Sequence, residues 1–263
     1  MSRSLFDRRH FKSLNISEVF LRFEEVTGRI STDPNAVFDY LREEDLTTRI
    51  IACEAYVGLI SINESLVRGS LADFIELLKT ELLPDLATRR DSESIGALSR
   101  IVFLIGDSAM MLSNPSSLIG LLDSSLLKLI EHPSARVVSA AVCALGKVFR
   151  AMPEEFSENH ALRLLSLLKS KDTAILSAAA SAWGEISSVN PKAGSKAASR
   201  IFMLLQNPNS DVRNQAVGYF FSLGRRTPVE CAFALPVLRE IRASDADKMV
   251  RERAWAAVQA ISR

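Results

Sequence analysis

A short pattern of apolar residues recurs along this chain at a nearly constant interval. In its clearest copy, Val212, Ala216 and Phe220 are spaced by four residues, which places them on one stripe of an α-helix. The pattern starts again at reference positions separated by 49, 40, 38, 37 and 38 residues, namely Thr48, Ala97, Val137, Ile175, Val212 and Val250. A period of this length indicates an array of stacked repeats.

A second apolar segment with helical periodicity precedes each stripe, so that one repeat is a pair of helices. Polar residues separate the two helices. We expect Asp172 and Asp211 to cap the second helices by accepting hydrogen bonds from their free backbone amides. Pro153, Pro191 and Pro228 follow second helices, where a proline prevents the helix from continuing.

Small residues recur within the stripe. An alanine stands four residues after several of the reference positions, at Ala141, Ala179, Ala216 and Ala254. The distance between two packed helix axes depends on the size of the side chains at the contact, so we expect these alanines to lie at close-packed crossings. Gly146 and Gly184 follow two of the alanines by five residues and indicate the same close approach.

Paired helices of about 38 residues, with Val-Arg-x-x-Ala in the second helix and an aspartate near its start, resemble HEAT repeats. The match is best at Asp211, Val212, Arg213 and Ala216, and at Val250, Arg251 and Ala254. The resemblance covers residues 33–263 and implies one continuous domain, an all-α, right-handed superhelix of about six helix pairs. Residues 1–32 are expected to form an N-terminal segment with a capping helix. Armadillo units are the nearest alternative, but they carry a third short helix, for which 38 residues leave little room.

No catalytic constellation is visible in the sequence. The phosphate-binding and dinucleotide-binding glycine motifs, the zinc motif H-E-x-x-H and the C-x-x-C motif are all absent. The histidines His10, His132 and His160 are far apart, and the cysteines Cys53, Cys143 and Cys231 each lie inside a helical pattern. We therefore expect no catalytic residue, no cofactor and no metal, and we interpret the cysteines as small core residues.

The charge is unevenly distributed, although the net charge of the chain is only +1. Residues 1–131 carry 14 Lys and Arg against 20 Asp and Glu, whereas residues 132–263 carry 18 against 11. A basic surface attracts anionic partners. The candidate partner-binding residues are therefore the basic residues of the second half together with one aromatic residue: Lys192, Lys196, Arg200, Arg213, Arg225, Arg226, Arg251, Arg253 and Trp255.

Six of these candidates have a local alternative. In HEAT repeats the arginine at the position of Arg213 and Arg251 often pairs with an aspartate of an adjacent repeat. Lys192, Arg225 and Arg226 fall in loops between helices, where simple solvation is the alternative. Trp255 replaces the small residues of earlier repeats and is either a cap over the last helix pair or an exposed anchor for a partner.

The resemblance implies a non-catalytic scaffold or adaptor that binds a protein partner on its curved helical surface, with the basic half contacting an anionic segment. The alternative is a nucleic-acid-binding HEAT-like module, including an enzyme similar to the DNA alkylpurine glycosylases, which place tryptophans around a damaged nucleotide. Trp183 occupies a core position of its repeat, however, and overall basicity is missing. The charged first residues contain no signal-peptide core, and the apolar runs are too short to span a membrane, so we expect a soluble cytoplasmic protein.

Overall fold

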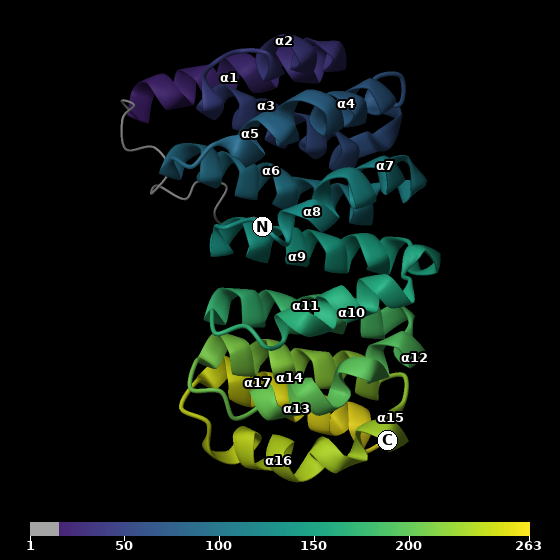
Figure 1. Cartoon of the computed structure of the whole chain (residues 1–263). Coiled ribbons are helices and arrows are strands. Elements are labelled where there is room, and N and C mark those ends of the chain that lie inside the picture. The colour runs from purple at the N-terminus through teal and green to yellow at the C-terminus, as the bar shows by residue number, and fades with distance from the viewer. Residues whose placement is uncertain (1–15) are drawn as a thin grey trace. The chain divides into compact units, whose positions relative to one another are not determined.

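Helices make up all of the regular structure that the computed structural model describes, which is residues 16–263, and no strand occurs in that range (Figure 1). The predicted all-α fold is confirmed. The chain divides into two compact units, Met1–Ser125 (unit 1) and Leu126–Arg263 (unit 2). Each unit is a series of helix pairs in which a first-helix segment precedes a longer second helix.

Unit 1 begins with α1 (Ile16–Thr32), which packs on α3 and is the expected N-terminal helix. The elements that follow are η2 (Pro34–Ala36), α2 (Val37–Leu41), α3 (Leu46–Asn63), η3 (Glu64–Leu66), α4 (Leu71–Leu77), η4 (Leu78–Leu82), α5 (Leu83–Thr88), α6 (Ser92–Met111), η5 (Pro115–Leu118) and α7 (Ile119–Leu121). The π-helical turn η6 (Leu122–Leu126) covers the division between the units.

Unit 2 contains four second helices that pack in sequence order, α9 on α11, α11 on α14 and α14 on α17. Its elements are α8 (Leu127–Leu129), α9 (Ala135–Ala151), η7 (Pro153–Glu155), α10 (Glu158–Leu167), α11 (Thr173–Val189), α12 (Pro191–Gly194), η8 (Ser195–Ala197), α13 (Ala198–Leu204), α14 (Ser210–Gly224), α15 (Pro228–Cys231), η9 (Ala232–Ala234), α16 (Leu235–Ser244) and α17 (Lys248–Ile261).

The second helices α11, α14 and α17 start with side-chain caps, whereas Ser134, at the start of α9, makes no side-chain cap hydrogen bond. Asp172 caps α11, since its carboxylate accepts hydrogen bonds from the amides of Ala174 and Ile175. The prediction for Asp211 is wrong, because Asn209 caps α14 by accepting from the Val212 amide. Asp211 lies inside the first turn of α14, where its carboxylate faces the positive end of the helix dipole.

The repeats at residues 191 and 228 contain a short additional helix. In each, a proline at the first position starts a four-residue helix, α12 or α15, which leads through a 3₁₀ turn into the main first helix. Proline suits this position because its fixed φ angle is helical and its missing amide hydrogen is not needed there. The expectation that 38 residues leave little room for a third short helix is therefore wrong, and these repeats have both HEAT and armadillo character.

The core of unit 2 follows the predicted stripe. Ala141, Ala179, Ala216 and Ala254 are all fully buried. The closest approach between α9 and α11 lies at Gly146, where a methyl group would stand 2.6 Å from the Ala182 Cα atom. At the equivalent Gly184, the nearest atom to such a methyl group is the Tyr219 Cα atom at 3.5 Å, which is an ordinary contact.

The helix α6 is long and apolar enough to cross a membrane by length and composition alone, but 67% of its most apolar stretch is buried. It packs against α3 and α5. This burial is that of a core helix in a folded unit, so α6 gives no more than weak support for a membrane span.

The two equivalent glycines provide a matched test of the packing. Gly146→Ala should lower the free energy of unfolding by about 1–3 kcal/mol, because the new methyl group meets backbone atoms that cannot rotate away. Gly184→Ala should leave stability unchanged or raise it by about 0.5–1 kcal/mol, because alanine is the better helix former and has room there. Urea titration of both variants checks this, and equal effects would contradict the packing.

Candidate functional site

The candidate partner-binding residues all lie in unit 2, but they do not form one patch. They fall into four places: α12 and the turn after α14 (Lys192, Arg225, Arg226), the first-helix segment η8–α13 (Lys196, Arg200), the starts of α14 and α17 (Arg213, Arg251), and the body of α17 (Arg253, Trp255). The expectation that Lys192 lies in a loop is wrong, because Pro191 starts the short helix α12 there. We call Lys192, Arg225 and Arg226 the basic edge.

The basic edge is held together by a hydrogen bond between repeats. Arg226 Nε donates to the carbonyl oxygen of Ser188 at 2.8 Å, which joins the end of α14 to the end of α11. Arg225 is exposed and its guanidinium lies 5.6 Å from the centre of the Phe221 ring. Lys192 is exposed, and its ammonium group has no hydrogen-bond or ion-pair partner among residues 16–263. Cations are favourable beside the negative C-terminal ends of helices, and here they remain accessible to an anion from solvent.

Lys196 and Arg200 connect two first-helix segments. The Lys196 ammonium group pairs with the carboxylate of Glu158 on α10. Arg200 Nη1 donates to the carbonyl oxygen of Leu165 at 2.8 Å, near the end of the same helix. Both charges therefore have partners within unit 2.

Arg213 pairs with an aspartate of the next repeat, which is the alternative to a role in partner binding. Its Nε and Nη2 atoms each lie 2.7 Å from an oxygen of Asp245, in the turn before α17. The two side chains are only 15% and 5% exposed. The hydrogen bond from Arg213 holds the pKa of Asp245 below its usual value. Arg251 donates to the Ala246 carbonyl oxygen at 3.1 Å and so holds the same turn.

The Arg213–Asp245 pair gives a pH-dependent prediction. Arg213→Gln should lower the free energy of unfolding at pH 7 by roughly 2 kcal/mol, because it breaks hydrogen bonds to a buried carboxylate. The pKa of Asp245 is lower in the folded than in the unfolded state, so this stabilisation is present above about pH 4 and is lost as the pH falls through the folded pKa.

Urea titrations of wild type and variant at pH 7 and near pH 2 measure this difference. Arg242→Gln is the control, since Arg242 is exposed on α16 in the same unit. A difference between wild type and Arg213→Gln that stays constant with pH would contradict the assignment.

Arg253 lies across the exposed side of α14. Its Nη1 atom donates to the Asn214 carbonyl oxygen at 3.2 Å and to Gln215 Oε1 at 3.4 Å. The guanidinium occupies the space above Gly218, where an added methyl group would stand 2.6 Å from Arg253 Cζ. Burial lowers the pKa of Arg253. The sequence prediction did not include Gly218, although the equivalent positions in neighbouring repeats hold small residues, Cys143, Ser181 and Ala256.

The two tryptophans differ completely in burial. Trp183 is fully buried and meets the edge of the Phe156 ring, with the ring centres 5.8 Å apart. Trp255 is 51% exposed, whereas the equivalent residues of earlier repeats, Val142, Ala180 and Val217, are fully buried. Trp183 is therefore a core residue, and Trp255 offers half of its surface to solvent.

This contrast predicts different costs of truncation. Trp183→Ala should lower the free energy of unfolding by about 3–5 kcal/mol, because it leaves a cavity in the core. Trp255→Ala should cost no more than about 1 kcal/mol, since only part of the ring is removed from water. Thermal and urea unfolding of both variants measure this, and a large loss of stability for Trp255→Ala would show that the ring acts as a cap.

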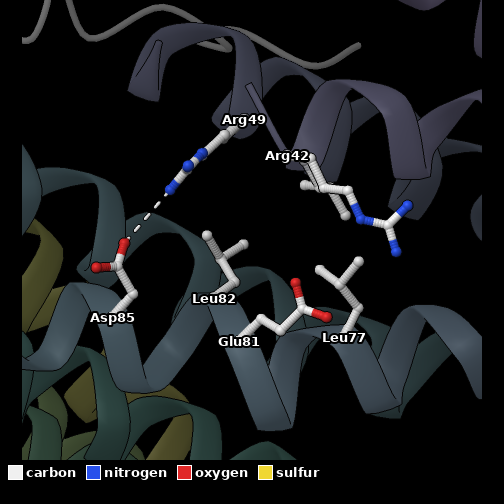
Figure 2. A pocket seen from close by; sticks show the side chains of 7 residues that line it. Arg42, Arg49, Leu77, Glu81, Leu82 and Asp85 are labelled. Carbon is white, nitrogen blue, oxygen red and sulfur yellow. Dashed lines mark hydrogen bonds and ion pairs between the residues drawn. The ribbon is translucent and has the colours of Figure 1, made fainter. Parts of the chain in front are cut away.

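A groove in unit 1 is a second candidate surface that the sequence did not predict (Figure 2). It has a volume of about 230 Å³ between α2–α3 and the α4–η4–α5 segment, and it is lined by Leu41, Arg42, Arg49, Leu77, Glu81, Leu82 and Asp85. A hollow of about 400 Å³ shares three of these residues and adds Phe38, Asp73, Glu76 and Thr80. The groove and the hollow are therefore adjacent, with Arg42, Leu77 and Glu81 common to both linings.

The other chemistry-bearing residues form no cluster. Among the described residues, no group of His, Cys, Asp and Glu is arranged to hold a metal ion. His160 belongs to the capping box of α10, and His10 lies outside the described residues. Burial raises the pKa of Cys143, and that of Cys231 to about 11, so both thiols stay protonated and unreactive at neutral pH.

No protein-family model and no curated protein matches this chain. Solved structures do match, at low sequence identity. The archaeal HEAT-like repeats protein from Thermococcus onnurineus NA1 is 16% identical with a TM-score of 0.58, covering 95% of this chain and 98% of that one. A designed armadillo repeat protein in complex with the peptide (KR)4 is 20% identical with a TM-score of 0.58, covering 87% and 98%. These likenesses show that the chain has a HEAT/armadillo-like repeat fold.

Proposed function

We propose that this protein is a non-catalytic scaffold that binds an acidic, extended segment of a protein partner at the basic edge of unit 2. The observation that carries the proposal is the edge itself, where Lys192 on α12 and Arg225 and Arg226 after α14 stand exposed. The bond from Arg226 to Ser188 holds the end of α14 against the end of α11 before any partner arrives, which reduces the entropy lost on binding.

The charge of unit 2 supports an anionic partner. Residues 126–263 carry 19 Lys and Arg against 12 Asp and Glu, a net charge of +7. Other cations of unit 2 have partners within the unit. Lys196 and Arg213 pair with carboxylates, and Arg253 donates to the side-chain oxygen of Gln215. At the basic edge, Lys192, Arg225 and Arg226 are exposed, and none of the three has a carboxylate partner within residues 16–263.

The fold supports a polypeptide as the partner. The solved neighbours are repeat scaffolds rather than enzymes, and one of the designed armadillo proteins binds the basic peptide (KR)4. The basic edge has the opposite sign, so the expected peptide is acidic. Tight binding of a single-stranded nucleic acid uses bases stacked on exposed aromatic rings beside the cations; Trp183 is buried, and the exposed Trp255 lies on α17 rather than at the basic edge.

Fluorescence anisotropy with three labelled probes tests the proposal: an acidic peptide of alternating Glu and Ser, a basic peptide of alternating Lys and Ser, and a dodecamer of deoxythymidine. The wild-type chain should prefer the acidic peptide, and its affinity should fall as salt rises. Lys192→Glu, Arg225→Glu and Arg226→Glu together should weaken that binding at least tenfold.

The matched control reverses three exposed cations elsewhere in unit 2, Lys169→Glu, Lys171→Glu and Arg239→Glu. It changes the net charge by the same amount and should retain most of the affinity. Equal loss in both variants would reduce the effect to net charge and contradict a site at the edge. Preference for the deoxythymidine probe would favour the nucleic-acid alternative.

A further inference from the structure

We propose that the groove of unit 1 is a separate binding site for a polypeptide segment in which a cationic side chain stands beside an apolar one. This inference concerns the other unit of the chain and does not depend on the basic edge. It rests on the shape of the groove, on the side chains that form its floor, and on the distribution of charge along its walls.

The floor of the groove is apolar. Leu41, Leu77 and Leu82 are buried residues whose side chains line its base, and the half-buried Phe38 lines the adjoining hollow. Figure 2 shows Leu77 and Leu82 pointing up from the η4 side toward the segment that carries Arg42 and Arg49. With about 230 Å³ in the groove and 400 Å³ in the hollow, the space accommodates side chains of a peptide rather than a large cofactor.

An irregular turn lies beside this floor. In the π-helical turn η4, the Leu83 amide donates to the Leu78 carbonyl five residues earlier. Pro84 follows the turn and has no amide hydrogen to donate to the Thr80 carbonyl. Glu81 and Leu82 of the turn both line the groove, which places a carboxylate beside an apolar side chain.

The walls differ in charge. Asp73, Glu76 and Glu81 follow one wall, and Arg42 stands on the other. Asp85 is shared by two arginines, Arg89 at 2.7 Å and Arg49 at 3.5 Å between Nη1 and Oδ2, so the end of the groove at Asp85 is not acidic. Lys79 pairs with Glu76 at 3.2 Å, but this is an exposed pair within one helical turn and is worth little. An excess of negative charge therefore remains along the α4–η4 wall.

Unit 1 as a whole has the same sign. Residues 1–125 carry 13 Lys and Arg against 19 Asp and Glu, a net charge of −6. A cationic segment is therefore drawn to this unit before it reaches the groove. The occupant that fits is a segment with an arginine or lysine facing the carboxylates and an apolar side chain resting on the three leucines.

The effect of Arg42→Gln on binding affinity distinguishes a cationic ligand from an anionic one. It is exposed and opposes the acidic wall across the groove, as Figure 2 shows. If the ligand is cationic, Arg42 repels it and Arg42→Gln strengthens binding. If the ligand is instead an anion held by Arg42, the same change weakens binding.

The probe is a fluorescein-labelled peptide of sequence GSRLRLSG, acetylated and amidated, compared with GSELELSG and GSRSRSSG on the full chain by fluorescence polarisation. We expect GSRLRLSG to bind at least tenfold more tightly than either analogue, because only it offers both charge and apolar contact. Glu76→Gln with Glu81→Gln should weaken its binding at least tenfold, and Arg42→Gln should strengthen it about threefold, an effect expected of one partly screened charge.

Two further variants make the test specific. Thr80→Trp fills the adjoining hollow from an exposed position and should block the peptide while leaving the thermal unfolding midpoint near that of wild type. Glu18→Gln with Glu24→Gln removes the same charge from exposed positions of α1 and should leave binding unchanged. Equal binding of the three peptides, weaker binding by Arg42→Gln, or equal losses in the groove and control variants would overturn the proposal.

The variant with Lys192, Arg225 and Arg226 reversed should bind GSRLRLSG at least as well as wild type. If that variant loses the acidic probe but keeps this peptide, the two sites are independent. If the wild-type chain binds GSRLRLSG but not the acidic peptide, the proposed function is contradicted and the proposal for the groove is still supported.

Discussion

Close packing between successive second helices is the constraint on which the rest of unit 2 depends. Neither helix of a pair can bury its apolar stripe alone, so each repeat must stack on its neighbour. The stack closes because the contact positions are small: Ala141 and Ala179 have no exposed surface, and Gly146 lies directly against the backbone of α11. Larger residues at these positions would separate the helices, and the loops that carry the surface charges would move with them.

The polar contacts at the loops depend on that spacing and decide which charges remain for a partner. Arg213 reaches from α14 to Asp245 of the following repeat, and Arg226 reaches back from α14 to Ser188 of the preceding one. The first is a buried pair that serves the fold. Arg226 remains exposed in the turn after α14. Stacking of the repeats therefore buries the charge of Arg213 against Asp245 but leaves the charge of Arg226 accessible to solvent.

Periodicity in the sequence was sufficient to predict the helix pairs, because each repeat carries its own stripe and its own cap. The cap at Asp211 was misassigned since Asn209, two residues earlier, has the spacing that reaches the Val212 amide. The groove of unit 1 was not predictable in this way. Its walls come from two repeats, and its floor includes a residue of the π-helical turn η4, whose irregular register a helical periodicity does not predict. The role of Gly218 also required the position of Arg253, which lies one repeat later.

Hydrogen–deuterium exchange of the full chain, with and without the acidic peptide, tests the central claim most directly. The account predicts slower amide exchange at residues 188–192 and 224–229, the two helix junctions of the basic edge, with no change at residues 38–42 and 73–85 around the groove. Protection confined to other parts of unit 2, or spread evenly over both units, would contradict a binding site at the basic edge.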